Sequence, residues 1–490
     1  MNIALEDMNE HKFKELFARS HDIVIESVRF GPRERAHTIV LMYCTGMAES
    51  SHISKVVLPG LLAVMEQAET VTPEILGTNN SLLLRRVDET DWYEPFLLRL
   101  YTGDLVLFIE SAGLLYTANT SMPPNRQPEE SSTEVSVKGP RDAFTEDLKT
   151  NVALVRKRLL THSLCCEIVT VGKRSHTSVA LLYIDDIANP DLVQNARSKL
   201  DRVDIDGLIS SGQLEEGLTD KGFSLFPLLE YIGRPDFIVD SLLRGRISLI
   251  VDGSPMALVA PANLTLILKS PEDVHFPSYY VAIERVLRLI GLTLAICFPG
   301  FYIAITSYNF DQIPFPLLAT IASVRIGLPL SGPMDFFLML GLFELLREAG
   351  VRLPKPVGQT VAVVGGLIVG DAAIRAGITS PATLVAVAIS TMAMYTLVNQ
   401  SLAGTVTLLR IMILIVSAAF GIFGFIVSLM ALALYLSTLE SFGVPYMAPI
   451  SPPSLRDIYT AVKYKVSKVA KHRPAFLEPT DDTRRKGGPS

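Results

Sequence analysis

Residues 344–366, ELLREAGVRLPKPVGQTVAVVGG, carry five ionisable side chains and two prolines next to apolar sequence on both sides. PMDFFLMLGLF (333–343) precedes them, and TVAVVGGLIVG (360–370) overlaps their end. A charge near the centre of a bilayer costs at least about 2.5 kcal/mol, so such side chains face partners, water or headgroups. The stretch therefore predicts either an interfacial loop between membrane segments or a polar path through them.

The composition of the chain indicates a membrane protein with a large soluble part. Its 490 residues are 49% hydrophobic and 19% charged, whereas a soluble domain carries about 25% charged residues. The deficit of charged residues lies between about 285 and 439, because the composition before 285 is that of an ordinary soluble protein. A net charge of −6 without a basic stripe argues against nucleic-acid binding.

The motifs of common enzymes and cofactor sites are missing from the sequence. It contains no GxxxxGK phosphate loop, no HExxH and no GxSxG. Its four cysteines lack the spacing of metal ligands or of a disulfide framework, and its eight histidines are scattered. We read His162 and His176 as surface residues, and we expect a protein that is not an enzyme and uses no cofactor or metal.

Residues 1–125 and 126–284 are predicted to form two related α/β units. A helix, a glycine, a strand and a hairpin recur around Gly103 and Gly245, which is the pattern of a weak internal repeat. Chance similarity of two hairpins is the alternative. In the second unit we expect a helix to start at Asp142. The N-terminus has no secretory signal, so both units are expected in the cytoplasm.

Residues 285–440 are predicted to form an all-α polytopic membrane domain, followed by a basic cytoplasmic tail, 441–490. A spanning helix needs about 20 mostly apolar residues. Segment 409–439 exceeds this length, so we expect it to tilt or to protrude from the bilayer. Positive residues flank the domain, so both termini are predicted to be cytoplasmic and the number of spans even. The four long predicted spans are 287–306, 357–377, 381–400 and 409–439; the shorter segments 314–330 and 333–350 form a hairpin or two further spans.

The charged stretch supplies the first candidate functional residues. If 334–350 is helical, Glu344 and Glu348 lie one turn apart on one face, and Arg347 lies beside Glu344. Pro354 then prevents continuation of the helix.

A new helix is expected to follow this proline-containing break. In it, Gly366 and Gly370 form a small-xxx-small face that permits close approach of another helix. Asp371 and Arg375 have the spacing of a pair within one helix.

Two interpretations of these groups stay open. In the first, the charges lie among headgroups and the glycines only pack helices. In the second, the groups line a water-filled path whose carboxylates attract cations, and a ring of copies encloses the path because one subunit has too few helices. The candidate pore or gating residues are Glu344, Arg347, Glu348, Gln359, Gly365, Gly366, Gly370, Asp371 and Arg375.

Four stretches of the sequence point to a known family. They are QPEESSTEVSVKGPRDAFTEDLKTNVALVRKRL (127–159), GRPDFIVDSLLRGRISLIVDGSP (233–255), SPEDVHFP (270–277) and FELLREAGVRLPKPVGQTVAVVGGLIVGDAAI (343–374). By these stretches the chain resembles the A subunit of the GerA-type spore germinant receptors of endospore-forming bacteria. The resemblance covers most of residues 125–440, and the first 120 residues match only in general character.

This resemblance implies a function and partners. A subunits of this family have a two-part cytoplasmic N-terminal region and act with a transporter-like B subunit, which senses the nutrient, and a lipoprotein C subunit. They are expected in the spore inner membrane as a ring, proposed to be a pentamer, that releases monovalent cations when nutrients arrive. Paralogues without a nutrient-sensing partner also exist. The alternatives are a secondary transporter, for which broken helices around Pro314 and Pro329 argue, and a non-conducting scaffold that couples a sensor to another channel.

Overall fold

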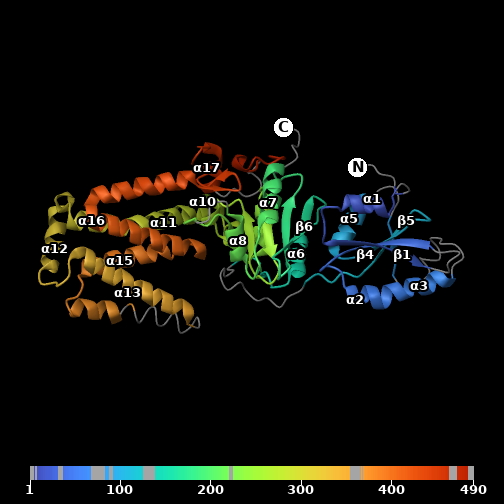
Figure 1. The fold of residues 1–490 in the computed structure, drawn as a ribbon, viewed down its shortest axis with the longest axis horizontal. Coiled ribbons are helices and arrows are strands. Elements are labelled where there is room, and N and C mark those ends of the chain that lie inside the picture. Colours follow the sequence, from blue (N-terminus) through green and yellow to red (C-terminus); the bar gives the residue numbers. More distant parts are fainter. Residues whose placement is uncertain are drawn as a thin grey trace.

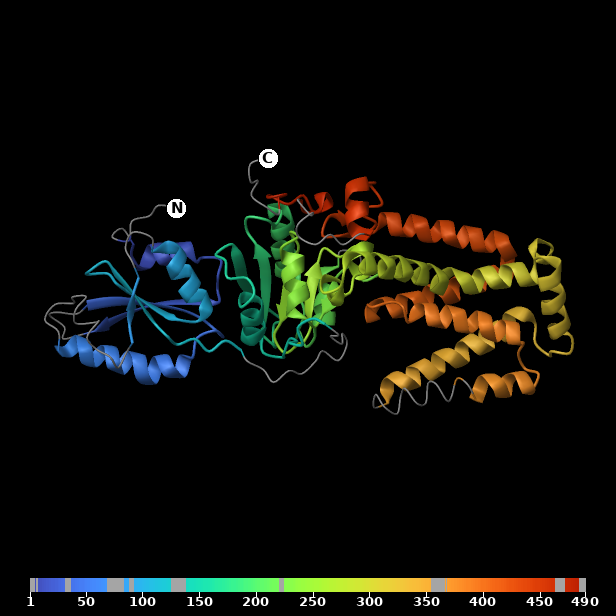
Figure 2. The same ribbon diagram turned by 180° about the vertical axis from the view of Figure 1, so that it is seen from behind.

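The structure, a computed structural model, describes residues 5, 8–30, 37–67, 83–87, 92–124, 138–219, 224–353, 366, 368–462 and 472–483. Two α/β units follow each other along the long axis of the molecule, and a region of long helices lies beyond the second unit (Figure 1). The view from behind shows the same order (Figure 2). The arrangement of the parts in space therefore follows their order in the chain.

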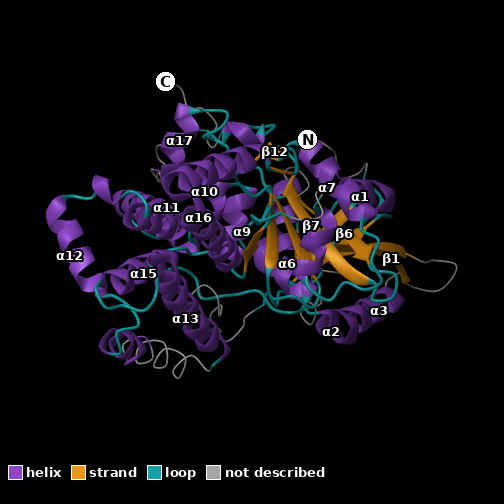
Figure 3. Ribbon diagram, turned by 60° about the vertical axis from the view of Figure 1, so that its left-hand side comes forward, coloured by secondary structure: helices purple, strands orange, loops and turns teal. Residues whose placement is uncertain are grey.

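The first unit is a five-stranded antiparallel sheet with helices on both faces (Figure 3). Its elements are α1 (Glu10–Leu16), β1 (Ile23–Phe30), β2 (His37–Cys44), α2 (Ser50–His52), the π-helix η2 (Ile53–Val57), α3 (Leu58–Gln67), β3 (Arg85–Arg86), α5 (Tyr93–Thr102), β4 (Leu105–Ile109) and β5 (Leu114–Ala118). The strand order is β1-β2-β4-β5-β3. Successive residues of a strand point to opposite faces, so Leu105 and Leu107 of β4 pack with α3 while Val106 and Phe108 pack with α1 and α5.

The second unit has the same construction. Its elements are α6 (Leu148–Arg156), β6 (Leu164–Val171), β7 (Thr177–Ile184), α7 (Pro190–Arg202), α8 (Ser211–Leu218), β8 (Glu230–Ile232), α9 (Pro235–Leu242), β9 (Ile247–Val251), β10 (Ala257–Ala260), α10 (Leu264–Ile267) and the 3-10 helix η3 (Pro271–Val274). The strand order, β6-β7-β9-β10-β8, is that of the first sheet position by position.

The internal repeat predicted around Gly103 and Gly245 is confirmed by this shared topology. Each glycine follows a helix, α5 or α9, and stands two residues before a fully buried strand, β4 or β9. Their φ angles are 97° and 94°, a left-handed conformation that only glycine adopts without strain. A side chain at Gly103 would also lie 2.3 Å from the carbonyl oxygen of Met47.

The helix expected from Asp142 begins later in the structure, so that prediction is wrong by one and a half turns. Helix α6 starts at Leu148, and Asp147 is its N-cap residue. The Asp147 carboxylate accepts a hydrogen bond from the backbone N–H of Thr150 at 2.8 Å. This cap satisfies a free N–H group of the first turn and thereby fixes where the helix starts.

A buried ion pair joins the two α/β units. The guanidinium of Arg156, at the end of α6, is 0% exposed, and its Nε and Nη2 donate to the two carboxylate oxygens of Asp22, each at 2.9 Å. The Tyr101 ring lies 4.7 Å from the guanidinium. Beside this pair, the N–H of His21 donates to the carbonyl of Cys166 on β6 at 2.9 Å. The first unit thus continues the edge of the second sheet.

The helical region contains six elements with described bounds. They are α11 (Ser278–Ser307), the 3-10 helix η4 (Phe310–Gln312), α12 (Phe315–Arg325), α13 (Gly332–Arg352), α15 (Pro381–Met394) and α16 (Gln400–Thr438). Within the described residues, two helical segments are long and apolar enough to cross a membrane, residues 278–307 and 401–438, and the second of them is interrupted at Gly421. The predicted span 357–377 is described only at Gly366 and from Ile368, and residues 368–375 are helical.

The two shorter predicted segments differ from each other. Helix α12 has 11 residues and lies at the end of the helical region farthest from the α/β units (Figure 1). Helix α13 has 21 residues, the length of a spanning helix. It ends at Arg352, before Pro354, as the sequence predicts.

Helix α16 is two antiparallel helices, so the single tilted or protruding span predicted over 409–439 is wrong. Gly421 has φ 61° and ψ −142°, which interrupts the helix. The chain then reverses, because Thr405 on the first half and Tyr435 on the second both bond to the backbone of Leu225, at its O and N respectively. A left-handed φ at this position needs glycine, and neither the apolar composition nor the helical period of the segment reveals it.

Helix α15 is also shorter than the span predicted over 381–400. It has 14 residues and ends at Met394, which gives a helix of about 21 Å. The chain turns at Tyr395, and the Asn399 carboxamide oxygen accepts from the N–H of Ser401 at 2.7 Å to cap α16. The polar end of the predicted span therefore starts the next helix.

The described part of the C-terminal tail packs on the second unit. Its elements are β11 (Glu440–Ser441), β12 (Val444–Pro445), α17 (Leu455–Val462) and the 3-10 helix η5 (Ala475–Leu477). The N–H of Leu264 donates to the carbonyl of Tyr446 at 3.0 Å, and the N–H of Thr480 donates to that of Ile187 at 3.0 Å. The end of the chain thus returns to the α/β side of the molecule.

Candidate functional site

Glu344 lies between two arginines inside the helical region. It projects from α13 and accepts a hydrogen bond from Nε of Arg347, one turn later on the same helix, at 2.9 Å. Arg410, on the first half of α16, forms an ion pair with the other carboxylate oxygen of Glu344 and is 0% exposed. An ionic group in an apolar helical layer needs such a partner, because removing a charge from water is costly.

The contact between Glu344 and Arg347 predicted from their spacing is confirmed. The pairing with Arg410 changes the electrostatic picture, because two positive charges surround one carboxylate. The Glu344 carboxylate therefore presents no unpaired negative charge. Glu348 is exposed on the surface of α13. The assignment of both residues to a pore stays a prediction.

Arg410 is the residue of this cluster that we did not single out from the sequence. It is the only charged residue between 400 and 438. A single ionisable residue in an otherwise apolar segment is a signal for a functional site by itself, and this signal would have found it. What the sequence does not show is the partner, which comes from another helix.

The second predicted pair is also formed. Nε of Arg375 lies 2.8 Å from Oδ2 of Asp371, and the side chains are 79% and 57% exposed. A Cβ at Gly370 would lie 3.3 Å from Leu384, so this glycine permits the close approach of α15. The structure does not describe a contact between this pair and Glu344.

Of the three remaining candidate residues, Gly366, Gly365 and Gln359, the structure describes only Gly366. A Cβ at Gly366 would lie 3.9 Å from the ring of Phe343, next to Glu344. Gln359 and Gly365 lie outside the described residues. Among the described residues, no group of three or more His, Cys, Asp or Glu side chains is placed to hold a metal ion.

Buried hydrogen bonds connect the second α/β unit to the helical region. Nδ2 of Asn399, at the start of α16, donates to Oε2 of Glu230 on β8 at 2.7 Å. The Ser441 hydroxyl, just after α16, donates to the carbonyl of Leu228 at 2.6 Å and accepts from the N–H of Ala262 at 3.0 Å. Both ends of the α16 hairpin are therefore bonded to the second α/β unit, so a displacement of either part can reach the other.

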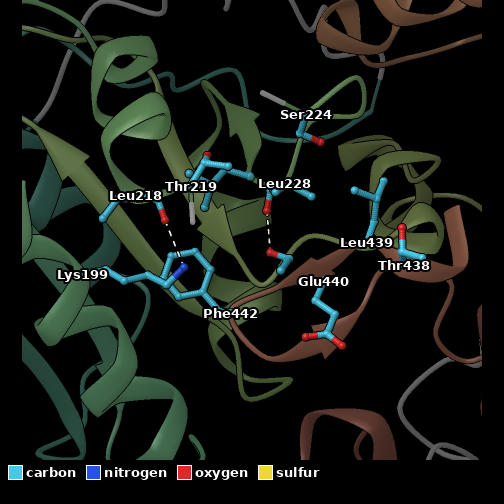
Figure 4. Close-up of a pocket in the computed structure, with 11 residues that line it drawn as sticks. Lys199, Leu218, Thr219, Ser224, Leu228, Thr438, Leu439, Glu440 and Phe442 are labelled. Atoms are coloured by element: carbon cyan, nitrogen blue, oxygen red, sulfur yellow. Dashed lines mark hydrogen bonds between the residues drawn. The ribbon is translucent and has the colours of Figure 1, made fainter. Parts of the chain in front are cut away.

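A cavity of about 290 Å³ lies at this junction (Figure 4). Nζ of Lys199 donates to the carbonyl of Leu218 at 3.0 Å and lies 4.7 Å from the centre of the Phe442 ring. A neighbouring cavity of about 580 Å³ is lined by Glu215 and Thr405, among others. Burial raises the pKa of Glu215, and the hydrogen bond from Tyr231 partly opposes this effect.

The fold and the site define a class of protein: two repeated α/β units joined to an apolar helical region that encloses ion pairs. Residues 11–476 match the family described as Bacillus/Clostridium GerA spore germination protein. The chain is 37% identical over 480 residues to spore germination protein XA of Bacillus anthracis, covering 98% of both chains. It is 33% identical over 422 residues to the uncharacterized membrane protein YfkQ of Bacillus subtilis (strain 168), covering 86% of this chain and 82% of that protein.

A solved structure is similar to the N-terminal half. It is the crystal structure of the N-terminal domain of the A subunit of the Bacillus megaterium spore germinant receptor GerK3, with 28% identity and a TM-score of 0.39. The similarity covers 51% of this chain and 92% of that chain. The chain belongs to the GerA family of spore germination proteins.

Proposed function

We propose that the chain is the A subunit of a spore nutrient germinant receptor and forms, with copies of itself, a ligand-gated cation channel. The observation that carries the proposal is the fully buried Arg410 paired with Glu344 between two apolar helices of a GerA-family chain. Ionisable side chains inside such a layer mark polar paths or gates rather than a passive anchor. One chain has too few helices to enclose a path, so a closed ring of copies supplies the walls.

The proposed topology places the α/β units and the tail in the cytoplasm and the helical region in the spore inner membrane. The contact of residues 472–483 with the second unit supports this topology, in which both ends of the chain lie on one side and the number of crossings is even. Helices α11 and α13, the segment 357–377, α15 and the two halves of α16 account for six. The division into 1–125, 126–284, 285–440 and 441–490 is part of this proposal.

The proposed partners are a transporter-like B subunit that binds the nutrient and a lipoprotein C subunit. The hydrogen bonds of Asn399 and Ser441 to the second unit support a coupled motion of the units and the helices. A nutrient signal that moves either part would then reach the other. This route requires that the receptor has two conformations, in which these contacts differ and which bind the nutrient with different affinity.

Proteoliposomes that contain the chain with its B and C partners test the function. We expect rapid potassium efflux when nutrient is added, and none without nutrient. Saturable exchange of a solute instead of efflux would identify a transporter. Absence of both efflux and exchange with all partners present would overturn the channel and favour the scaffold.

The pore residues are tested best at Asp371, because its side chain is exposed and its replacement leaves no buried charge behind. We expect Asp371→Asn to change the rate of potassium release while membrane abundance stays normal. Arg375→Gln removes the same ion pair but keeps the carboxylate, so it separates the effect of the pair from that of the negative charge. If Asp371→Asn releases potassium like the parent, Asp371 does not line the path.

A further inference from the structure

A second carboxylate, Asp335, is buried in the helical region without a charged partner. It is 1% exposed and lies in the first turn of α13. The Thr383 hydroxyl donates to its Oδ2 at 2.8 Å. Its Oδ1 has no hydrogen-bond partner, and within the described part of the chain no cationic side chain pairs with it. A buried carboxylate in this state is neutralised either by a proton or by a bound cation.

Hydroxyl oxygens surround this carboxylate. Ser380 Oγ lies 2.9 Å from Thr383 Oγ1, and both side chains are buried at the start of α15. The Tyr302 hydroxyl on α11 is buried without a hydrogen bond, and its ring centre lies 5.8 Å from that of Phe336, the residue after Asp335. Three helices therefore bring oxygen atoms to one point. Oxygen ligands of this kind suit alkali cations, which replace their hydration shell with carboxylate and hydroxyl groups.

Helix ends and an arginine also surround Asp335. The N-terminal ends of α13 and α15 meet at this point, and the positive end of a helix dipole stabilises a negative charge. A cation bound here would supply both a countercharge and the missing contact to Oδ1. Arg325 forms no ion pair with Asp335: its Nη1 donates to the carbonyl of Thr306 at 3.3 Å, and its Nη2 is buried without a hydrogen-bond partner.

We propose that Asp335, Thr383, Ser380 and Tyr302 form a binding site for one dehydrated monovalent cation, sodium or potassium. This inference rests on the proposed function in one respect, because the cation path of the channel would deliver the ion to the site. Binding of the ion itself requires only the folded chain. None of the four residues is among the predicted pore residues, so the site adds a position to the path rather than renaming one.

The test measures binding and thermal unfolding of the full-length chain in detergent. We expect about one ⁸⁶Rb⁺ or ²²Na⁺ ion bound per chain, and an unfolding midpoint a few degrees higher in sodium or potassium chloride than in N-methyl-D-glucamine chloride of equal ionic strength. Asp335→Asn is expected to weaken ion binding at least about tenfold and to remove the difference in midpoint.

Thr383→Val keeps the shape of the side chain and removes one ligand, so it tests the site if Asp335→Asn does not fold. Ser390→Ala is the matched control, because the Ser390 hydroxyl, on the same helix, donates to the carbonyl of Ala295 at 3.2 Å. It should retain the cation effect. Equal midpoints for the parent in all three salts, or an unchanged cation effect in both Asp335→Asn and Thr383→Val, would overturn the site.

The same experiment separates this inference from the proposed channel. If proteoliposomes conduct potassium but the chain binds no ion at Asp335, only the site is wrong. If the ion binds and the complete receptor does not conduct, the site stands and the channel is wrong. A midpoint that depends on pH alone, with no effect of cation, would identify a protonated carboxyl and overturn the cation site.

Discussion

Arg410 and Glu344 form an ion pair between α16 and α13, and the guanidinium is completely enclosed by the protein. Removing one partner of a buried pair leaves an unpaired charge, which costs about 3–5 kcal/mol. We therefore expect Glu344→Gln, which leaves the enclosed Arg410 charge without its counter-ion, to lower the unfolding midpoint of the purified chain strongly. The double variant Glu344→Gln with Arg410→Met should recover most of the loss, because the enclosed charge is then removed as well and the remaining Arg347 is 24% exposed. A double variant as unstable as the single one would contradict this account.

The reversal of the chain at Gly421 predicts that adding one methyl group there, in Gly421→Ala, destabilises the protein. Gly421→Ala forces a left-handed alanine, which costs about 1–2 kcal/mol, and its Cβ would lie 2.9 Å from Cβ of Tyr308. We expect a lower unfolding midpoint and lower membrane abundance. Gly404→Ala, on the same element, meets nothing within 4 Å and should be neutral or stabilising. Equal behaviour of the two variants would show that α16 does not reverse at Gly421.

The pair between Asp22 and Arg156 predicts that the two α/β units unfold together. Asp22→Asn leaves the enclosed Arg156 charge without its counter-ion, so we expect a loss of about 3–5 kcal/mol. Separate calorimetric transitions of the units would then appear in place of one. The exposed pair of Arg19 and Asp185 joins the same units, and Asp185→Asn should change stability by less than about 1 kcal/mol. Similar losses in the two variants would argue against the role of burial.

His162 predicts how this interface depends on pH. The side chain is half-buried with its ring edge against Phe17, not on the surface as expected from the sequence. Burial lowers the pKa of His162, and the Arg156 charge lowers it further. The unfolded chain therefore takes up a proton more readily than the folded one. The free energy of unfolding is therefore unaffected by His162 above the usual histidine pKa of about 6.5, and it decreases as the pH falls below that value.

The measurement is the unfolding midpoint of the parent and of His162→Gln between pH 7.5 and pH 5, with the pH as the only variable. We expect a smaller decrease with falling pH in the variant than in the parent. His176→Gln, at an exposed position, should follow the parent. Parallel curves for all three proteins would exclude His162 as a source of the pH dependence.

The repeat of the two units could be predicted because its signals are local. Gly103 and Gly245 each need a left-handed conformation, and the strands after them are apolar except for Ser248. Such features depend on backbone sterics and burial, which a short window of sequence contains. The pairing of Glu344 with Arg347 and of Asp371 with Arg375 was predictable for the same reason, since each lies within one helix.

The reversal of α16 and the partner of Arg410 depend on contacts between distant segments. Gly421 stands in an apolar stretch whose composition fits one long helix equally well, and the Tyr308 hydroxyl that bonds to the carbonyl of Ala418 comes from the end of α11. Asp335 was missed because a carboxylate in the first turn of a helix is ordinary in sequence. Only the convergence of α11, α13 and α15 shows that one of its oxygens lacks a partner.

The docking of the C-terminal tail changes what a truncation would do. A premature stop codon after Thr438 would leave every apolar helix in place, so membrane insertion would proceed. It would also delete Ser441, whose hydroxyl bridges Leu228 and Ala262, and uncover the underside of the second sheet. Such a shortened product should be recognised by quality-control proteases. A nonsense allele there would thus behave as a null allele rather than as a receptor that has lost a dispensable extension.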